Sequence, residues 1–230
     1  KLVSYILYSL AQLSLALKGS VGMSDELDSL ANSLYNGEIP HTWKLLAPLT
    51  SKKLGLWLKH YKLRYLQYKK WSEKPLKPLN VIWLSGLHIP ESYLTALIQT
   101  RCRKMTWPLD KSSLYTCVTN YHDETEIPEH MKQCEDGGTY VKGLYIEGAA
   151  WNGHELIPQR NKELISSLPI IKIIPIQSNK LKRQHIYEAP VYVTQNRRNA
   201  MGIGYVFTAD LHTKQHKSHW LLSGVALVLN

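Results

Sequence analysis

Two glycines, Gly138 and Gly143, have the spacing with which a phosphate-binding loop begins. In such a loop the second glycine is followed by a lysine that reaches the phosphates and by a Ser or Thr that holds Mg²⁺. Here Leu144 and Tyr145 follow instead. The sequence therefore argues against an intact ATP site in this chain, and no nucleotide-binding residue and no cofactor are assigned.

Histidines gather in two places that could suggest a metal site. His212, His216 and His219 fall within eight residues of each other, and His122 and His130 lie in the stretch that leads to a cysteine. A metal needs ligands that converge with a defined geometry, which spacing alone does not show. The first group falls in a Lys-rich segment that reads as a hairpin loop, where solvated histidines are expected. We expect no metal in this chain.

Covalent and acid–base catalysis find little support. The Gly-x-Ser-x-Gly pattern of a nucleophile elbow is absent from the sequence. Carboxylates such as Glu147, Glu155, Glu163 and Glu188 are scattered singly among expected strands. Acid–base chemistry depends on folded geometry, which the sequence does not reveal. No catalytic residue is assigned.

A basic aromatic helix is the strongest rival site. In residues 51–71, Lys and Arg alternate with Trp and Tyr, a combination that can track a nucleic-acid backbone and stack bases. The same pattern is typical of an amphipathic helix whose aromatic face is buried. The residues of that face are Leu54, Trp57, Leu58, Tyr61, Tyr65 and Tyr68. The aromatic periodicity favours burial, and a nucleic-acid-binding module remains the alternative function.

The first half of the sequence has helical periodicity. A helix over Leu2–Leu17 ends at Lys18-Gly19, and a second begins at the cap Ser24 and stops before Gly37. The helix of residues 51–71 comes next. A short apolar piece, Val81 to Leu84, then leads into a fourth helix after Pro90.

After about Leu109 the apolar period becomes 2 and indicates strands. The predicted strands are Leu114–Thr119, Tyr140–Glu147, Ile170–Ile174, Ile186–Thr194, Tyr205–Leu211 and Trp220–Leu229. The stretch from Gly137 to Trp151 carries four glycines, as the kinked wall of a barrel requires. We predict an α+β fold: a helical segment 1–80, a helical junction 81–112, and an antiparallel, barrel-like β subdomain 113–230 of about six strands.

Composition places the sequence among folded intracellular proteins. Its net charge is +10, and most of the excess lies in residues 1–112, which hold 16 Lys and Arg against 7 Asp and Glu. Three cysteines without close spacing favour free thiols in a reducing, cytoplasmic compartment. The uncharged run Leu2–Leu17 is shorter than the roughly 20 residues that span a bilayer, so no membrane association is expected.

The ordered landmarks of the sequence resemble the C-terminal region of dynein heavy chains, of the axonemal type. The match is densest at Trp83-Leu84-Ser85-Gly86-Leu87, Pro90 and Pro108-Leu109-Asp110, and it continues through Tyr140–Ala149 to Gly224-Val225-Ala226-Leu227. The sequence departs from the family pattern at Ala150 and Asn152, where a basic and an acidic residue are usual, and at Ala189 and Val193.

The resemblance implies the end of the sixth AAA module followed by a C-terminal domain on one face of the ring of a minus-end-directed microtubule motor in cilia or flagella. ATP and Mg²⁺ would be bound by other modules, and the microtubule would be contacted only indirectly. Partners would be other AAA+ modules of the same heavy chain and dynein complex subunits, at the cytoskeleton of the axoneme. The expected role is non-catalytic bracing and regulation. Candidate interface and structural residues are Trp83, Gly86, Pro90, Tyr93, Arg101, Arg103, Lys104, Trp107, Gly143, Gly148 and Trp151.

Overall fold

The computed structural model describes residues 1–47, 50, 52–75, 77, 79–132, 134–177, 184–193 and 204–229. The protein divides into two compact units, Lys1–Leu66 (unit 1) and Gln67–Asn230 (unit 2). The predicted three-part division at residues 80 and 112 stays a prediction. Ser51 and Thr194, which were expected to begin a helix and end a strand, lie outside the described residues.

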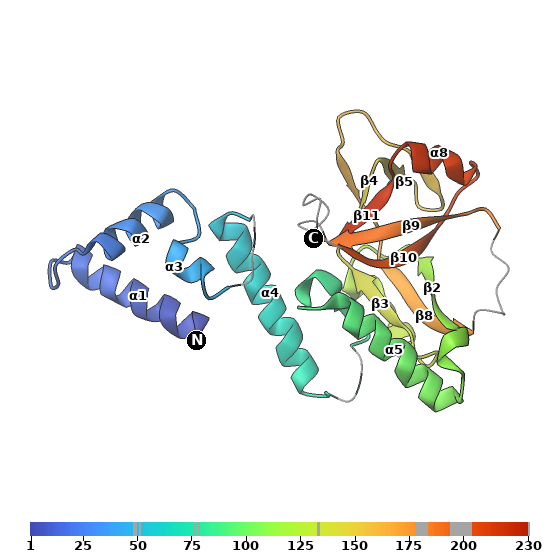
Figure 1. Cartoon of the computed structure of the whole chain (residues 1–230), viewed down its shortest axis with the longest axis horizontal. Helices are drawn as coiled ribbons and strands as arrows, with labels where there is room; N and C mark the ends of the chain where they lie inside the picture. The colour runs from blue at the N-terminus through green and yellow to red at the C-terminus, as the bar shows by residue number, and fades with distance from the viewer. Residues whose placement is uncertain are drawn as a thin grey trace. The chain divides into compact units, whose positions relative to one another are not determined.

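Unit 1 is helical, as predicted. Its helices are α1 (Leu2–Leu17), α2 (Asp25–Tyr35), α3 (His41–Lys44) and the first part of α4 (Leu54–Ser72). Local signals place the helix ends: the Ser24 side chain accepts a hydrogen bond from the Leu27 N–H, and Gly37 has a φ of +66° just beyond α2. Figure 1 shows α1 and α2 packed side by side.

A small apolar core holds unit 1 together. Leu13, Leu30, Ile39, Trp43 and Trp57 are buried in it. The two tryptophan rings stack with centroids 6.4 Å apart. The indole N–H of Trp43 donates to the Ser9 hydroxyl oxygen at 3.1 Å, so this buried polar group is satisfied.

Unit 2 combines helices with two sheets and a hairpin. Its helical elements are the end of α4, the 3₁₀ turns η1 (Leu84–Gly86), η2 (Leu109–Lys111) and η3 (Glu124–Glu126), and the helices α5 (Pro90–Met105), α6 (Glu129–Lys132) and α8 (Lys217–Leu222). Its strands are β1 (Val81–Trp83), β2 (Ser112–Val118), β3 (Thr139–Lys142), β4 (Leu144–Glu147), β5 (Ala149–Trp151), β6 (Leu156–Pro158), β7 (Ile165–Ser167), β8 (Ile171–Gln177), β9 (Ile186–Val193), β10 (Tyr205–His212) and β11 (Ala226–Leu229). The α+β prediction is confirmed.

The two sheets have a barrel-like arrangement. One sheet has the order β1-β3-β8-β2 and the other β10-β9-β11-β4-β7. The backbone passes from β3 to β4 through Gly143, so the sheets share one kinked segment. At the other side β2 and β10 lie next to each other, and the Asp210 N–H donates to the Thr116 hydroxyl at 2.6 Å. This contact is no strand ladder, so the wall is barrel-like without being closed.

The core of unit 2 lies between these sheets. Alternate residues of the strands point inward, which follows from the two-residue period of a strand. Ile82, Val141, Ile146, Ile171 and Leu227 are fully buried there. Helix α5 packs against β2, β8 and β10 and covers one side of the wall, as can be followed in Figure 1.

The structure departs from the predicted strands in four ways. Strands β5, β6 and β7 form between two of the predicted segments, so the described part of unit 2 has more strands than the six expected. The segment Tyr140–Glu147 is two strands, because Gly143 has a φ of +83° and breaks the extended backbone. Trp220 lies in helix α8, and the last strand begins only at Ala226. The sheets are mixed, since β1 pairs with β3 and β11 with β9 in parallel.

Helix α8 forms where a strand was predicted because the Trp220 side chain is held by burial and by a hydrogen bond to Thr213. The Trp220 ring is fully buried, and its N–H donates to the Thr213 hydroxyl at 2.7 Å. His216 caps the helix by accepting a hydrogen bond from the Ser218 N–H, and Gly224, with a φ of +66°, follows it. These contacts outweigh the strand propensity of the following apolar run.

Candidate interaction site

Trp83 lies in the core of unit 2. Its backbone is held by the side-chain amide of Gln67: Nε2 donates to the Trp83 carbonyl oxygen at 3.0 Å, and Oε1 accepts from the Trp83 N–H at 2.8 Å. Gly86 lies against the indole, because a Cβ there would come within 2.6 Å of Trp83 Cε3. Trp83 and Gly86 therefore act inside the fold, and the side chain of Trp83 is not displayed as a surface contact.

Tyr93 is also buried, and it ends a series of hydrogen bonds. The Thr139 hydroxyl donates to the Leu79 carbonyl oxygen at 2.8 Å, and the Tyr93 hydroxyl donates to Thr139 Oγ1 at 3.3 Å. The Tyr93 ring meets Trp71 edge to face at 5.6 Å. Burial raises the pKa of Tyr93 to about 12. Tyr93 thus fixes α5 against β3, and Pro90 at the first turn of α5 sets where that helix begins.

Arg101, near the end of α5, is partly buried. Its guanidinium carbon lies 5.7 Å from the centre of the Trp107 ring, and Nη1 donates to the Glu135 carbonyl oxygen at 3.4 Å. Its Cδ faces Gly137, where a Cβ would be 3.0 Å away. Arg103 and Lys104, in the last turn, are exposed. Neither makes an ion pair within the described part of the protein, so both are available for contact with another surface.

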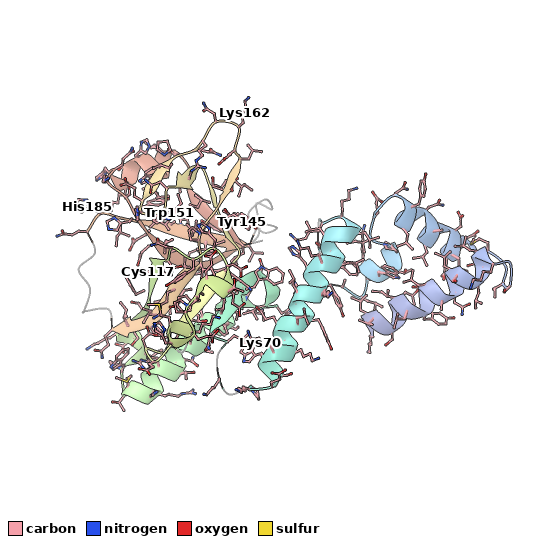
Figure 2. The ribbon with its side chains drawn as sticks, turned by 180° about the vertical axis from the view of Figure 1, so that it is seen from behind. Lys70, Cys117, Tyr145, Trp151, Lys162 and His185 are labelled. Carbon is pink, nitrogen blue, oxygen red and sulfur yellow. The ribbon has the colours of Figure 1, made fainter. Side chains whose placement is uncertain are left out.

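A cleft of ≈ 1280 Å³ opens beside these residues and is lined entirely by unit 2. One wall is the C-terminal end of α4 and the segment after it, and the other is α5 with residues 124–138. At its edge the Glu124 carboxylate binds two lysines, Lys70 at 3.0 Å and Lys142 at 2.9 Å. Lys70 is labelled in Figure 2 on α4.

The remaining predicted residues, Gly143, Gly148 and Trp151, belong to the β wall. Gly148 has a φ of +81°, and a Cβ there would come 2.8 Å from the Ser223 carbonyl oxygen. Trp151 packs against the core, and its buried N–H has no hydrogen-bond acceptor among the described residues. Figure 2 shows Trp151 and Lys70 at separate places on unit 2. The predicted residues therefore form two groups.

Two of the thiols are held in the unreactive form at neutral pH. Cys102, Cys117 and Cys134 are free, as predicted. Burial raises the pKa of the Cys117 thiol, and it raises that of Cys134 to about 11. A protonated thiol is a poor nucleophile and a poor metal ligand. Within the residues that the structure describes, no three His, Cys, Asp or Glu side chains are arranged to hold a metal.

The basic aromatic helix α4 serves the fold with several of its residues. Trp57 is buried in unit 1, and Trp71 packs against the core of unit 2. The Tyr68 hydroxyl accepts a hydrogen bond from the His88 N–H at 3.3 Å. Other rings, such as Tyr65 with an exposed fraction of 59%, remain at the surface. The aromatic side chains are thus not all turned inward, although both tryptophans are.

No described helix is long and apolar enough to cross a bilayer.

Sequence reasoning missed Gln67, Thr139 and Glu124. Gln67 shares a helix face with Trp71, four residues on, and a polar residue on a buried face signals a specific hydrogen bond. Thr139 follows two glycines, and Glu124 sits in an acidic stretch that reads as a solvated loop. Nothing local reveals the partners of those two residues.

Comparison with known proteins covers nearly the whole sequence. Residues 1–229 match the family described as the C-terminal domain of the dynein heavy chain. The protein is 53% identical over 224 residues to the Dynein-1-alpha heavy chain of the flagellar inner arm I1 complex of Chlamydomonas reinhardtii, covering 96% of this chain and 5% of that one. It is 52% identical over 232 residues to human Dynein axonemal heavy chain 10, covering 100% of this chain and 5% of that one. It is 37% identical to the ciliary Dynein beta chain of Tripneustes gratilla, over 99% of this chain and 5% of that one. The sequence therefore spans about 5% of the length of these relatives.

Proposed function

The protein belongs to the dynein heavy chain family, in its C-terminal domain, and from that premise we propose that it braces and regulates the AAA+ ring of an axonemal motor without doing chemistry itself. In this proposal ATP is bound and hydrolysed by other modules of the same heavy chain, and the microtubule is contacted only indirectly. The place of action is the cytoskeleton of a cilium or flagellum, and the partners are the other AAA+ modules and the subunits of the dynein complex.

The observation that carries the proposal is the match of residues 1–229 to one C-terminal domain family, together with relatives whose names are axonemal, flagellar and ciliary. The geometry is consistent with it. Two residues that sequence reasoning associated with a site are engaged inside the fold: Trp83 is buried with its backbone bonded to Gln67, and the Tyr93 hydroxyl donates to Thr139. Burial raises the pKa of the Cys117 and Cys134 thiols further above neutral pH, which disfavours the reactive thiolate. These features suit a stable domain that acts through contacts with other parts of the motor.

A non-catalytic domain can regulate the ring only if its contacts differ between the conformational states of the ring. A domain can shift a ring between conformational states only by binding one state better than another. Arg103 and Lys104 are suited to that role because both are exposed at the end of α5 and make no ion pair within the described residues. A charge at an interface rim changes the relative energies of docked states by pairing in one and not in the other.

The test uses a full-length motor. We expect the double variant Arg103→Glu, Lys104→Glu to change the ratio of ATP turnover to microtubule gliding speed, with an unchanged melting temperature. The matched control is Lys162→Glu, Lys217→Glu, which makes the same charge change at two exposed residues elsewhere in unit 2. If both variants keep the wild-type ratio, or if only the melting temperature changes, the regulatory part of the proposal is wrong.

A further inference from the structure

The cleft of ≈ 1280 Å³ in unit 2 is large enough to hold a segment of polypeptide. Its length follows α5, from Ser92 to Lys104, on one side and the end of α4 on the other. Side chains of α5 that line it, Ser92, Ala96 and Thr100, are short and lie at least partly at the surface. They leave the cleft open along the helix.

Apolar groups form the floor of the cleft. Leu79, Leu87 and Leu97 are buried beneath it and line it. Ile89 lies at its side with an exposed fraction of 55%. An occupant with apolar side chains would cover this surface, and the removal of apolar area from water favours binding.

Among the charged residues of the cleft that are not in ion pairs, positive charges outnumber negative ones. Lys70 is paired with Glu124, and Lys132 with Glu129. Lys74, Lys77 and Lys104 are exposed and make no ion pair among the described residues, and Arg101 contacts only a backbone carbonyl and an aromatic ring there. The unpaired carboxylates of the described lining are Glu73 and Glu135. The cleft therefore presents more free cations than free anions.

Arg101 adds a donor in need of an acceptor. Its Nε is buried and has no hydrogen-bond partner within the described part of the protein, although the residue lines the cleft. A carboxylate is the acceptor that matches a guanidinium group best, so an acidic occupant could pair with the part of this group that is not buried.

We propose that this cleft is a docking site for an acidic polypeptide segment that also carries apolar side chains. The apolar side chains lie on the floor formed by Leu87 and Leu97 and against Ile89 at its side. The carboxylates meet Lys74, Lys77, Lys104 and the guanidinium group of Arg101. The proposal rests on the cleft and its charges.

The same cations could attract nucleic acid, but the lining favours a peptide. Base stacking requires aromatic faces that are open to the ligand. Trp71 and Tyr93, which line the cleft, are packed edge to face against each other, and Tyr93 is buried. Tyr68 also lines the cleft with an exposed fraction of 41%, but its hydroxyl is held by the His88 N–H, so only one partly open ring is offered among the described lining residues. Glu73 and Glu135 would also repel a continuous phosphate backbone, whereas a peptide can place its carboxylates away from them.

The test measures binding of a fluorescent synthetic peptide of alternating Glu and Leu to the 230-residue protein by anisotropy. We expect saturable binding that weakens with salt, and about tenfold weaker binding to the variant Lys74→Glu, Lys77→Glu, Lys104→Glu, since three charge contacts are reversed. The matched control, Lys111→Glu, Lys162→Glu, Lys217→Glu, carries the same net charge and should bind within about twofold of wild type. Figure 2 shows Lys162 on a loop at the other end of unit 2 from Lys70.

Three further probes separate the alternatives. A Gln/Leu peptide without charge and a Glu/Ser peptide without apolar side chains should both bind at least about tenfold more weakly than the Glu/Leu peptide. The first lacks carboxylates for the cations, and the second lacks apolar side chains for the floor of the cleft. Equal losses in the cleft and control variants would mean nonspecific attraction to a basic protein and would overturn the proposal. So would tighter binding of an oligothymidylate than of the peptide, or no saturable peptide binding at low salt. Circular dichroism and thermal melting confirm that each variant is folded before binding is compared.

Discussion

The side-chain amide of Gln67 forms two hydrogen bonds with the backbone of Trp83, one to its carbonyl oxygen at 3.0 Å and one from its N–H at 2.8 Å. An amide that both donates and accepts in this way imitates a neighbouring strand. Trp83 is the last residue of β1, which lies at the edge of its sheet. Gln67 therefore satisfies backbone groups that an edge strand leaves open.

Gln67→Ala should destabilise unit 2. The substitution leaves a partly buried carbonyl and a partly buried N–H of Trp83 without these partners, and such a loss costs about 1–3 kcal/mol. Urea unfolding of the 230-residue protein measures the change. Gln99→Ala, on α5, is the control, since the Gln99 side chain has no hydrogen bond within the described residues, and it should stay within about 0.5 kcal/mol of wild type. Equal effects of the two substitutions would contradict the role of the Gln67 amide.

Gly148→Ala should destabilise the β wall more than a substitution at another left-handed glycine. At Gly148 the φ of +81° and a carbonyl oxygen 2.8 Å from the added Cβ both oppose a side chain. Gly224 has a φ of +66° with nothing within 4 Å, so Gly224→Ala isolates the backbone term of about 1–2 kcal/mol. Denaturation midpoints of the two variants give the comparison. If Gly224→Ala proves as harmful as Gly148→Ala, the close approach to Ser223 contributes nothing.

Glu124 should make part of the stability depend on acid pH. Burial by itself raises the pKa of this carboxyl, but the hydrogen bonds and charges of Lys142 and Lys70 outweigh it, and the folded pKa lies below 4.5. A lowered folded pKa contributes stability above the unfolded value, and that contribution is lost as pH falls through the folded pKa. The stability difference between wild type and Glu124→Gln should therefore be on the order of 0.5–1 kcal/mol at pH 7.

The measurement for Glu124 is a series of urea unfolding curves at decreasing pH. The difference between wild type and Glu124→Gln should shrink once the pH is below 4.5, since the wild-type carboxylate then becomes protonated and resembles the amide. Glu91→Gln, in the first turn of α5, is the comparison for an acidic residue outside an ion pair among the described residues. A difference that stays constant down to acid denaturation would show that the Lys142 and Lys70 contacts carry no charge-dependent stability.

Tyr93 should make stability fall in alkali. Its pKa is raised to about 12 by burial, so the neutral hydroxyl is the form that the fold stabilises. A raised folded pKa means that this contribution is complete below the ordinary value of 10.0 and is lost as pH rises toward 12. Tyr93→Phe should remove this alkaline loss, while Tyr35→Phe, at an exposed tyrosine, should keep it. Thermal melting across alkaline pH tests this, and the same alkaline loss in Tyr93→Phe would refute it.

Several helix ends, and the family of this protein, could be predicted from the sequence. The helix Leu2–Leu17 was predicted with the bounds that the structure has, because the charged residue and glycine that follow it are local stop signals. Ser24 caps α2 for the same kind of reason. The six segments predicted as strands all contain a strand, since a two-residue apolar period reports burial on one face.

The partners of those elements could not be predicted, because they lie far away in sequence. Gln67 meets Trp83 across 16 residues, and Thr116 meets Asp210 across 94. Periodicity tells which face of a strand is buried, but it does not tell which strand lies beside it or in which direction that strand runs. For this reason the parallel pairing of β11 with β9 and the helical state of Trp220 appear only in the folded protein.

The sequence by itself determined that this protein is a helical segment followed by a β wall without a phosphate loop, and its ordered landmarks determined the family. Only the tertiary structure decided which predicted contact residues are exposed, placing Trp83 and Tyr93 inside and Arg103 and Lys104 outside. It also assembled the cleft from α4, α5 and residues 124–138. The physical reason is that burial and cleft shape are sums over contacts between distant segments, whereas helix and strand signals are written within a few neighbouring residues.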